Sequence, residues 1–365
     1  MSDADPGPGP AAGVSPSRPA PVAATDAEAT VRAALARWTL PLGWVAMALV
    51  TVAAVAGVLP AGRWRYVPLV GSALAFGLPH GAVDHLAPAW ANDDSADART
   101  LAGVGVLYAV LGGAYAVAWF LAPAASFVGF LLLTWLHWGQ GDSYAVVTFG
   151  PEPTHLRSTA TRATALVVRG GLPMVVPLVA FPEVYREVAT LVVGAFGPAA
   201  AEGVAVLFRT DVRLALGGGL LAVTLVHLGG TAERSRAWAL DAAEVVGLWV
   251  AFALTPPIVA VGAYFTAWHA PRHVARLLLI DDGARPALQA GDLTAALTRF
   301  ARVAAPMTAG GVVVMAGLWV SLPRLPGGFA GVVAVYLVGL AALTLPHTVV
   351  VAAMDRAEGL WRAGG

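Results

Sequence analysis

The segment GAYFTAWHAPRH, residues 262–273, places two histidines and an arginine inside an apolar stretch that runs from Val245 to Ile280. Imidazole and guanidinium groups are costly in hydrocarbon, so they indicate a functional site when they occur there. His269 and His273 are four residues apart, and one face of a helix could direct both at a single ion, as in HExxH metal helices. Pro271 lies between them and would distort this pair unless a helix starts nearby.

Three more polar islands interrupt long apolar stretches, and together the four islands contain six of the eight histidines. Neutral imidazole is the commonest metal ligand among side chains. The pattern therefore predicts a metal site built of histidines within a membrane bundle. The other islands are LPHGAVDHL (Leu78 to Leu86), WLHWGQGD (Trp135 to Asp142) and LPHTVVVAAMD (Leu345 to Asp355).

Spacing assigns roles within the first of these islands. His80 and Asp84 share a helical face, whereas His85 lies about 140° further round from His80. We therefore expect His80 to bind the metal, with Asp84 or His85 holding a ligand by hydrogen bonding. A structural His80–Asp84 pair that seals two helices is the alternative. His137, between Trp135 and Trp138, is expected to be a ligand.

Four further polar residues are expected to support the site. They are Asp142, five residues after His137, and His227, His347 and Asp355 near the ends of spans. Arg272 cannot lose its charge in hydrocarbon, so it needs a carboxylate partner among Asp84, Asp142 and Glu244. His155 lies in a proline-containing loop, where we expect it to be solvated.

Composition places the chain among integral membrane proteins. It is 58% hydrophobic and 12% charged, against about 25% charged in an average soluble domain. Mean hydropathy is +0.72. The formal net charge is zero, which gives no sign of a nucleic-acid partner. The absence of cysteine excludes disulfides, thiolate metal sites and cysteine nucleophiles. A tightly bound metal must therefore use histidine and carboxylate.

We expect an all-α, polytopic membrane bundle of about eight to ten transmembrane helices, because each span needs about 20 apolar residues. Residues 1–30, rich in proline, alanine and glycine, should form a disordered tail, and residues 31–365 the membrane domain with its buried metal site. Val184 to Phe208 could be one more span or an interfacial helix, and Thr255-Pro256-Pro257 should break a helix. RGGLPMVVP, residues 169–177, suits a pocket wall or a kink. The candidate spans are Leu40–Leu59, Tyr66–Ala87, Leu101–Ala122, Ala125–Val146, Ala163–Phe181, Leu214–Gly230, Val245–Ile280, Val303–Leu322 and Phe329–Ala353.

With these motifs in this order, the chain from about Tyr66 to Asp355 resembles the Brp/Blh family, membrane-integral carotene dioxygenases found alongside microbial rhodopsins. The resemblance is carried by HGAVDH, HWGQGD, RGGLPMVVP, WHAPRH and PHTVVVAAMD. It implies that His80, His137, His269 and His273 hold one Fe(2+) ion, the four histidines that the residue pattern also favours. It also implies cleavage of β-carotene by O₂ at the central 15,15′ double bond into two all-trans-retinal molecules. The retinal would pass to a microbial rhodopsin in the cell membrane.

A carotene dissolves only in the bilayer and has no polar group, so its pocket must recognise it by shape. From their proximity to the islands, seven aromatic residues are expected to form the pocket wall: Phe76, Trp135, Trp138, Tyr144, Tyr264, Phe265 and Trp268.

Two other readings remain open. One is another membrane lipid oxidase, such as a desaturase, which would use two metals and usually eight or more clustered histidines. The second is a membrane protein without enzymatic activity that binds retinal or a carotenoid, or a transporter with Asp84 and Asp142 in a proton path. The metal content of the purified protein distinguishes these functions. One iron per chain supports the dioxygenase, two support the lipid oxidase, and none supports a binding protein or transporter.

Overall fold

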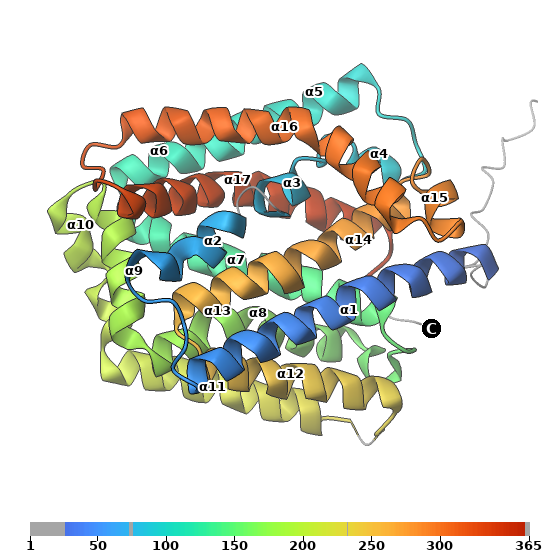
Figure 1. Ribbon diagram of the computed structural model, residues 1–365, viewed down its shortest axis with the longest axis horizontal. Helices are drawn as coiled ribbons and strands as arrows, with labels where there is room; N and C mark the ends of the chain where they lie inside the picture. The colour runs from blue at the N-terminus through green and yellow to red at the C-terminus, as the bar shows by residue number, and fades with distance from the viewer. Residues whose placement is uncertain (1–25, 73–75, 232, 362–365) are drawn as a thin grey trace, which may run out of the picture.

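The computed structural model describes residues 26–72, 76–231 and 233–361, and in these ranges the regular elements are all helical (Figure 1). Seven described helical segments are long and apolar enough to cross a membrane. The expected all-α, multi-pass membrane bundle is therefore confirmed. The seven are α1 (Asp26–Val55), α5 continuing into α6 (Ala98–Leu107 and Gly113–Leu121), α8 (Thr159–Ala180), α11 (Thr210–Gly229), α12 (Arg236–Leu254), α16 (Leu293–Ser321) and α17 (Phe329–Ala357).

Two further long helical stretches contain polar islands. They are α7 (Pro123–Phe149) and the continuous run of α13 (Pro257–Tyr264), η6 (Phe265–His269) and α14 (Ala270–Ile280). Their histidines, arginines and carboxylates lower the hydropathy by which spans are recognised. For this reason, only seven described helices are apolar enough to be recognised as spans, whereas eight to ten spans were expected.

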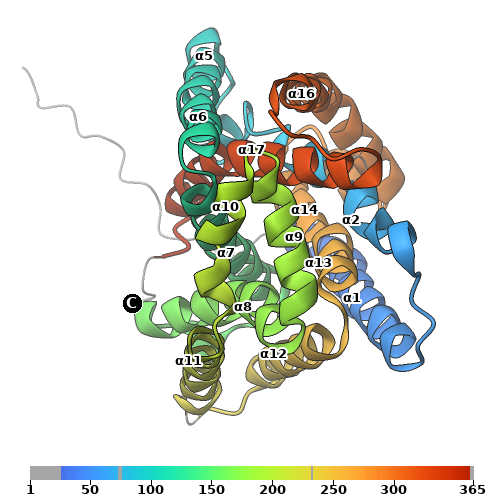
Figure 2. The same cartoon turned by 90° about the vertical axis from the view of Figure 1, so that its left-hand side faces the viewer.

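The helices form an inner group and an outer group. Viewed along the helix axes, α7, α8, α13 and α14 lie in the interior, whereas α1, α5, α6, α11 and α16 lie at the periphery (Figure 2). In α8 and α17 most of the apolar span is buried, while in α1, α5 with α6, α11 and α16 only 11–17% of it is buried. Their exposed residues are large and apolar, such as Leu121 at 79% and Val320 at 82%. Such a surface suits contact with lipid.

Close backbone packing holds α7 against α8. A Cβ atom added at Gly170 would lie 1.9 Å from the carbonyl oxygen of Trp135, and one at Gly139 would lie 2.3 Å from that of Leu166. Only glycine permits this approach. The RGGLPMVVP motif thus brings α8 directly onto the helix that carries His137.

The expected single span from Tyr66 to Ala87 is corrected by the structure. Short helices α2 (Val67–Ser72), α3 (Leu78–Gly81) and α4 (Ala87–Trp90) follow one another here, and residues 73–75 lie outside the described ranges. Pro79 and Pro88 each stand in the first turn of a short helix, because proline suits a helix start and not a helix interior. Apolar composition alone cannot distinguish such a broken segment from a continuous helix.

The predicted break at the prolines is confirmed. Helix α12 ends at Leu254 and α13 begins at Pro257, so Thr255-Pro256-Pro257 does break the long segment. Pro271 follows the wider π-helical turn of η6 directly, within the continuous helical run. Both histidines of WHAPRH therefore lie on helical backbone.

The stretch from Val184 to Phe208 is neither a span nor one interfacial helix. It contains α9 (Pro182–Gly194), α10 (Pro198–Gly203) and η5 (Ala205–Phe208). At the other end, helix α1 begins at Asp26, within the stretch expected as a tail. The rest of that tail, residues 1–25, lies outside the described residues.

Candidate metal centre

Five buried histidines from five helical elements meet at one point in the bundle. His80 comes from α3, His137 from α7, His269 from the end of η6, His273 from α14 and His347 from α17. The His137 ring centre lies 4.8 Å from that of His269 and 4.5 Å from that of His347. His80 lies 5.5 Å from His273 by the same measure. Each of the five residues is at most 5% exposed.

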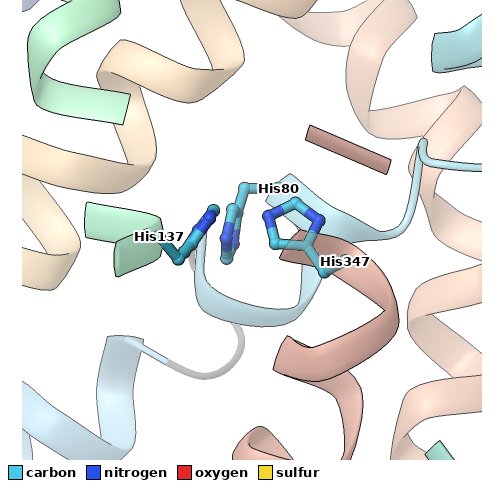
Figure 3. A group of neighbouring side chains, drawn as sticks. All are labelled: His80, His137 and His347. Carbon is cyan, nitrogen blue, oxygen red and sulfur yellow. The ribbon is translucent and has the colours of Figure 1, made fainter. Parts of the chain in front are cut away.

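The four expected ligands are thus brought together, and His347 joins them. His80, His137 and His347 face one another in Figure 3, and each offers a ligand atom within 4.8 Å of the others. The residue pattern had placed His347 among supporting groups at a helix end. The tripeptide Leu345-Pro346-His347 does repeat Leu78-Pro79-His80, but three shared residues do not show where a side chain lies.

Hydrogen bonds orient two of the rings. The Nδ1–H group of His80 donates to the carbonyl oxygen of Gly77 at 2.5 Å, and that of His347 donates to Asp84 Oδ2 at 2.7 Å. Metal-binding histidines usually donate their other nitrogen to a carbonyl or carboxylate in this way, which leaves Nε2 free for the ion. Asp84 also accepts a hydrogen bond from the Tyr108 hydroxyl group, at 2.5 Å.

Several ring nitrogens in the cluster have no hydrogen-bond partner among the described residues. They are Nδ1 of His137 and His269, both nitrogens of His273, and Nε2 of His347. Nε2 of His137 and Nε2 of His269 lie 3.1 Å apart. Buried polar atoms normally find a partner, so a convergent group without partners calls for one. A cation fits these lone pairs, and imidazole donors suit iron, zinc, copper and nickel.

A buried ionic network lies beside the cluster. Arg272 donates to Asp142 Oδ1 at 2.9 Å and to Glu244 Oε1 at 2.6 Å, two of the three partners expected for it. Arg169 donates to Asp142 and Glu244 and also to Asp241. The Trp268 indole N–H group donates to Asp142 Oδ1 at 2.7 Å. Asp142 therefore holds Trp268, which precedes His269, and Arg272, which precedes His273, and no hydrogen bond joins it to an imidazole of the cluster.

His155 and His227 belong to this network and not to the histidine cluster. Their Nε2 atoms lie 2.9 Å and 3.0 Å from Asp241 Oδ2. The expectation that His155 is solvated is wrong, because its side chain is buried. A short loop between α7 and α8 folds back into the bundle, and polarity of the sequence around His155 could not reveal this.

Two other residues expected near the site lie outside its centre. Asp355 accepts a hydrogen bond from Arg276 at 2.9 Å and joins α17 to α14. His85 is half-buried and its Nδ1–H group donates to the Ala82 carbonyl oxygen at 3.0 Å.

A cavity of about 610 Å³ reaches the histidine cluster, and His80, His137 and His347 form part of its wall. Most of the remaining wall is aliphatic or aromatic, as in sites for apolar ligands. Of the seven aromatic residues expected there, Trp138 and Phe265 line it. The placement of the other five is corrected, because proximity in sequence does not determine which face of a helix a side chain occupies. Trp135 donates to the Val167 carbonyl oxygen of α8, and Tyr144 donates to Glu358. Phe76, Tyr264 and Trp268 pack into the hydrophobic core.

Comparisons with known proteins agree on one family. Residues 71–355 match the family described as "Beta-carotene 15,15'-dioxygenase", a range that contains the whole histidine cluster. The chain is 46% identical over 343 residues to "Probable beta-carotene 15,15'-dioxygenase Blh" of Halobacterium salinarum, covering 93% of this chain and 99% of the relative. It is 31% identical over 304 residues to "Probable beta-carotene 15,15'-dioxygenase Brp" of the same organism, covering 79% and 83%. No solved structure matches the chain.

Proposed function

The chain belongs to the β-carotene 15,15′-dioxygenase family, and on this premise we propose that it cleaves β-carotene with O₂ at the central 15,15′ double bond into two molecules of all-trans-retinal. The observation that supports this function best is the position of the imidazole cluster. Three imidazoles of the five-histidine cluster, those of His80, His137 and His347, stand at the wall of an apolar cavity within a membrane bundle. This arrangement pairs a metal site with room for a hydrocarbon that dissolves only in lipid.

Iron is the proposed cofactor, and His80, His137, His269 and His273 are its proposed ligands. His347 is proposed as a fifth, since its Nε2 atom has no hydrogen-bond partner and its ring offers a ligand atom close to those of His80 and His137. Bound Fe(2+) would supply the one-electron chemistry that reaction with O₂ requires. Neutral imidazoles add no negative charge, so the ion would keep its full charge in a region of low dielectric constant.

The residues of the protein orient the imidazole rings and exclude water from the site. Gly77 and Asp84 fix the rings of His80 and His347 through their Nδ1–H groups. Trp138 stacks at 5.8 Å on Phe265, and both side chains lie between the cavity and His269. These apolar rings keep water from the centre and leave shape as the means of aligning the central double bond.

The distribution of histidines argues against the lipid oxidase with two metals. Five imidazoles form one group, while His155 and His227 surround Asp241 as hydrogen-bond donors. A second ion would meet the Arg169 guanidinium at this carboxylate. We therefore propose one iron per chain. The protein is a multi-pass membrane protein, and we propose the cell membrane as its location and a microbial rhodopsin as the recipient of its retinal.

Expression in cells that accumulate β-carotene tests this function. We expect the orange colour to fade and retinal to appear, with O₂ consumed. Purified protein should contain about one iron per chain. Unchanged pigment in cells with well-expressed protein would contradict the proposed activity.

Single alanine variants test the ligands. Alanine at His80, His137, His269 or His273 should abolish activity and lower bound iron, because each change removes one of few donors. His155→Ala is the matched control, since this buried histidine serves Asp241 instead. It should lower stability by about 1–3 kcal/mol through the lost hydrogen bond and retain iron in the folded protein. A ligand variant that keeps full activity and iron would remove that histidine from the set.

A further inference from the structure

Two groups of residues in the cavity wall differ in their exposure. One part of the wall, here called the outer arm, comes from α5 and α16 and includes Leu101, Gly105, Met307, Gly310 and Val314. The other, the inner arm, comes from α7, α9 and α13 and includes Phe127, Phe130, Tyr185, Val188 and Ile258. His80, His137 and His347 line the same cavity.

The outer arm opens to the outside of the bundle. Leu101 is 39% exposed, Met307 50% and Val314 42%, although all three line the cavity. Gly105 and Gly310 are exposed as well. In Figure 2, α5 and α6 stand apart from α16, with α17 beneath them. These helices are mostly exposed and apolar, so the opening faces the hydrocarbon of the bilayer and not water.

The inner arm is lined by covered side chains. Each of its lining residues named above is buried or half-buried, and Phe127 and Ile258 are only 3% exposed. Tyr185 of helix α9 packs with Phe208. A long, extended ligand that enters by the outer arm could therefore reach both the histidines and these buried side chains within one cavity.

We infer that the outer arm between α5 and α16 is the lateral entrance for the substrate, and that it holds the outer half of the substrate while the inner half occupies the inner arm. This inference rests on the proposed function and adds to it how the centre of an extended apolar chain reaches the imidazoles. The occupant it names is the carotene itself, drawn from the bilayer. The depth of the inner arm then decides which double bond stops beside the cluster.

Glycines provide the width of the entrance. A Cβ atom added at Gly105 or at Gly310 would meet nothing within 4 Å, so the space beside both residues is open. A large side chain at either position would fill the outer arm without straining its own helix. Gly103 on α5 and Gly317 on α16 also have nothing within 4 Å, and neither lines the cavity. They are controls on the same two helices.

The test compares the double variant Gly105→Phe, Gly310→Phe with the double variant Gly103→Phe, Gly317→Phe. In the first variant, kcat/KM for β-carotene should fall on the order of tenfold, because the phenylalanine side chains block the entrance through which the substrate binds. The second variant should have the same kcat/KM as the original protein. A second measurement does not need activity. Both pairs are also made in the His269→Ala protein, which is purified from carotene-accumulating cells, and carotene bound per chain is read from its absorbance.

The two measurements separate this inference from the proposed function. Reduced cleavage and reduced bound carotene in the Gly105, Gly310 variant alone would support the entrance. Equal values in both double variants, with normal cleavage, would overturn the entrance and leave the function standing. Absent cleavage in every protein, with bound carotene lost only in the Gly105, Gly310 variant, would support the entrance and contradict the enzyme. Phospholipid in place of carotene in the purified proteins would contradict the inference.

Discussion

Asp84 links two parts of the candidate site through one carboxylate. Its Oδ2 atom accepts hydrogen bonds from His347 Nδ1, at 2.7 Å, and from the Tyr108 hydroxyl group. Asp84 comes from the turn after α3, whereas His347 lies in α17 and Tyr108 begins the π-helical turn η3 (Tyr108–Gly112). The alternative of a structural His80–Asp84 pair is not what the structure shows, because Asp84 bonds His347. A single carboxylate thus fixes the ring of one proposed ligand against the cavity wall.

Replacing Asp84 by asparagine keeps the shape of the side chain and removes its charge. Loss of the partner of a ligating histidine typically weakens metal binding by about 10- to 100-fold, and we expect Asp84→Asn to weaken iron binding to this extent. Titration of the metal-free protein with Fe(2+) measures the change. Asp97→Asn is the control, because Asp97 is an exposed cap of α5 and asparagine caps a helix equally well. Equal iron affinity in both variants would place His347 outside the ligand set.

At the scale of elements, the contact between α7 and α8 positions the site. His137 on α7 faces the cluster while Gly139, two residues later, lets α8 approach. Arg169 and Gly170 on α8 are adjacent, so the same turn supplies both the ionic network and the close contact. A wider separation of these helices would move the His137 ring away from its neighbours.

Gly170→Ala should therefore be strongly destabilising. The new methyl group would overlap the Trp135 carbonyl oxygen, and overpacking of this kind costs about 1–3 kcal/mol or more. Thermal unfolding of the protein in detergent measures the loss. Gly219→Ala on α11 is the matched control, since its methyl group would meet nothing within 4 Å. It should leave stability unchanged or raise it by up to about 1 kcal/mol through helix propensity. An equal effect of both changes would show that the contact has no special importance.

At the scale of the whole molecule, buried charges join helices that are distant in sequence. Arg169 of α8 reaches Asp142 of α7 and both Asp241 and Glu244 of α12. The Trp44 indole of α1 donates to Glu244 at 2.9 Å, and Arg272 brings in α14. All of these charged groups are almost completely buried, so each depends on its partners for solvation.

Arg169→Met should leave three buried carboxylates short of a cation. Removal of one partner from a buried ion pair costs about 3–5 kcal/mol, and we expect a loss of that size in unfolding free energy, with less monodisperse protein recovered in detergent. Arg157→Met tests an ordinary ion pair, because Arg157 and Glu152 are both exposed and 3.4 Å apart. It should change stability by less than about 1 kcal/mol. Similar melting temperatures for the two variants would contradict the importance assigned to the network.

Local physical chemistry made much of this protein predictable. Long apolar runs predicted the multi-pass helical bundle, because a bilayer requires helices whose backbone groups are satisfied internally. Proline predicted the break after Leu254, since it removes a backbone donor. Histidines in apolar surroundings predicted which residues to examine for a metal site, because their burial is otherwise costly.

What remained undetermined depends on how helices pack. The sequence could not show that residues 66–87 form several short helices, that His347 joins the cluster, or that His155 is buried beside Asp241. Nor could it show which aromatic rings line the cavity or where the cavity opens. Hydropathy and spacing describe one element at a time, whereas these features depend on which faces of distant helices meet. The sequence by itself determined the bundle and the chemistry available in it, and the tertiary structure alone decided the meeting of five imidazoles and which exposed apolar helices line their cavity.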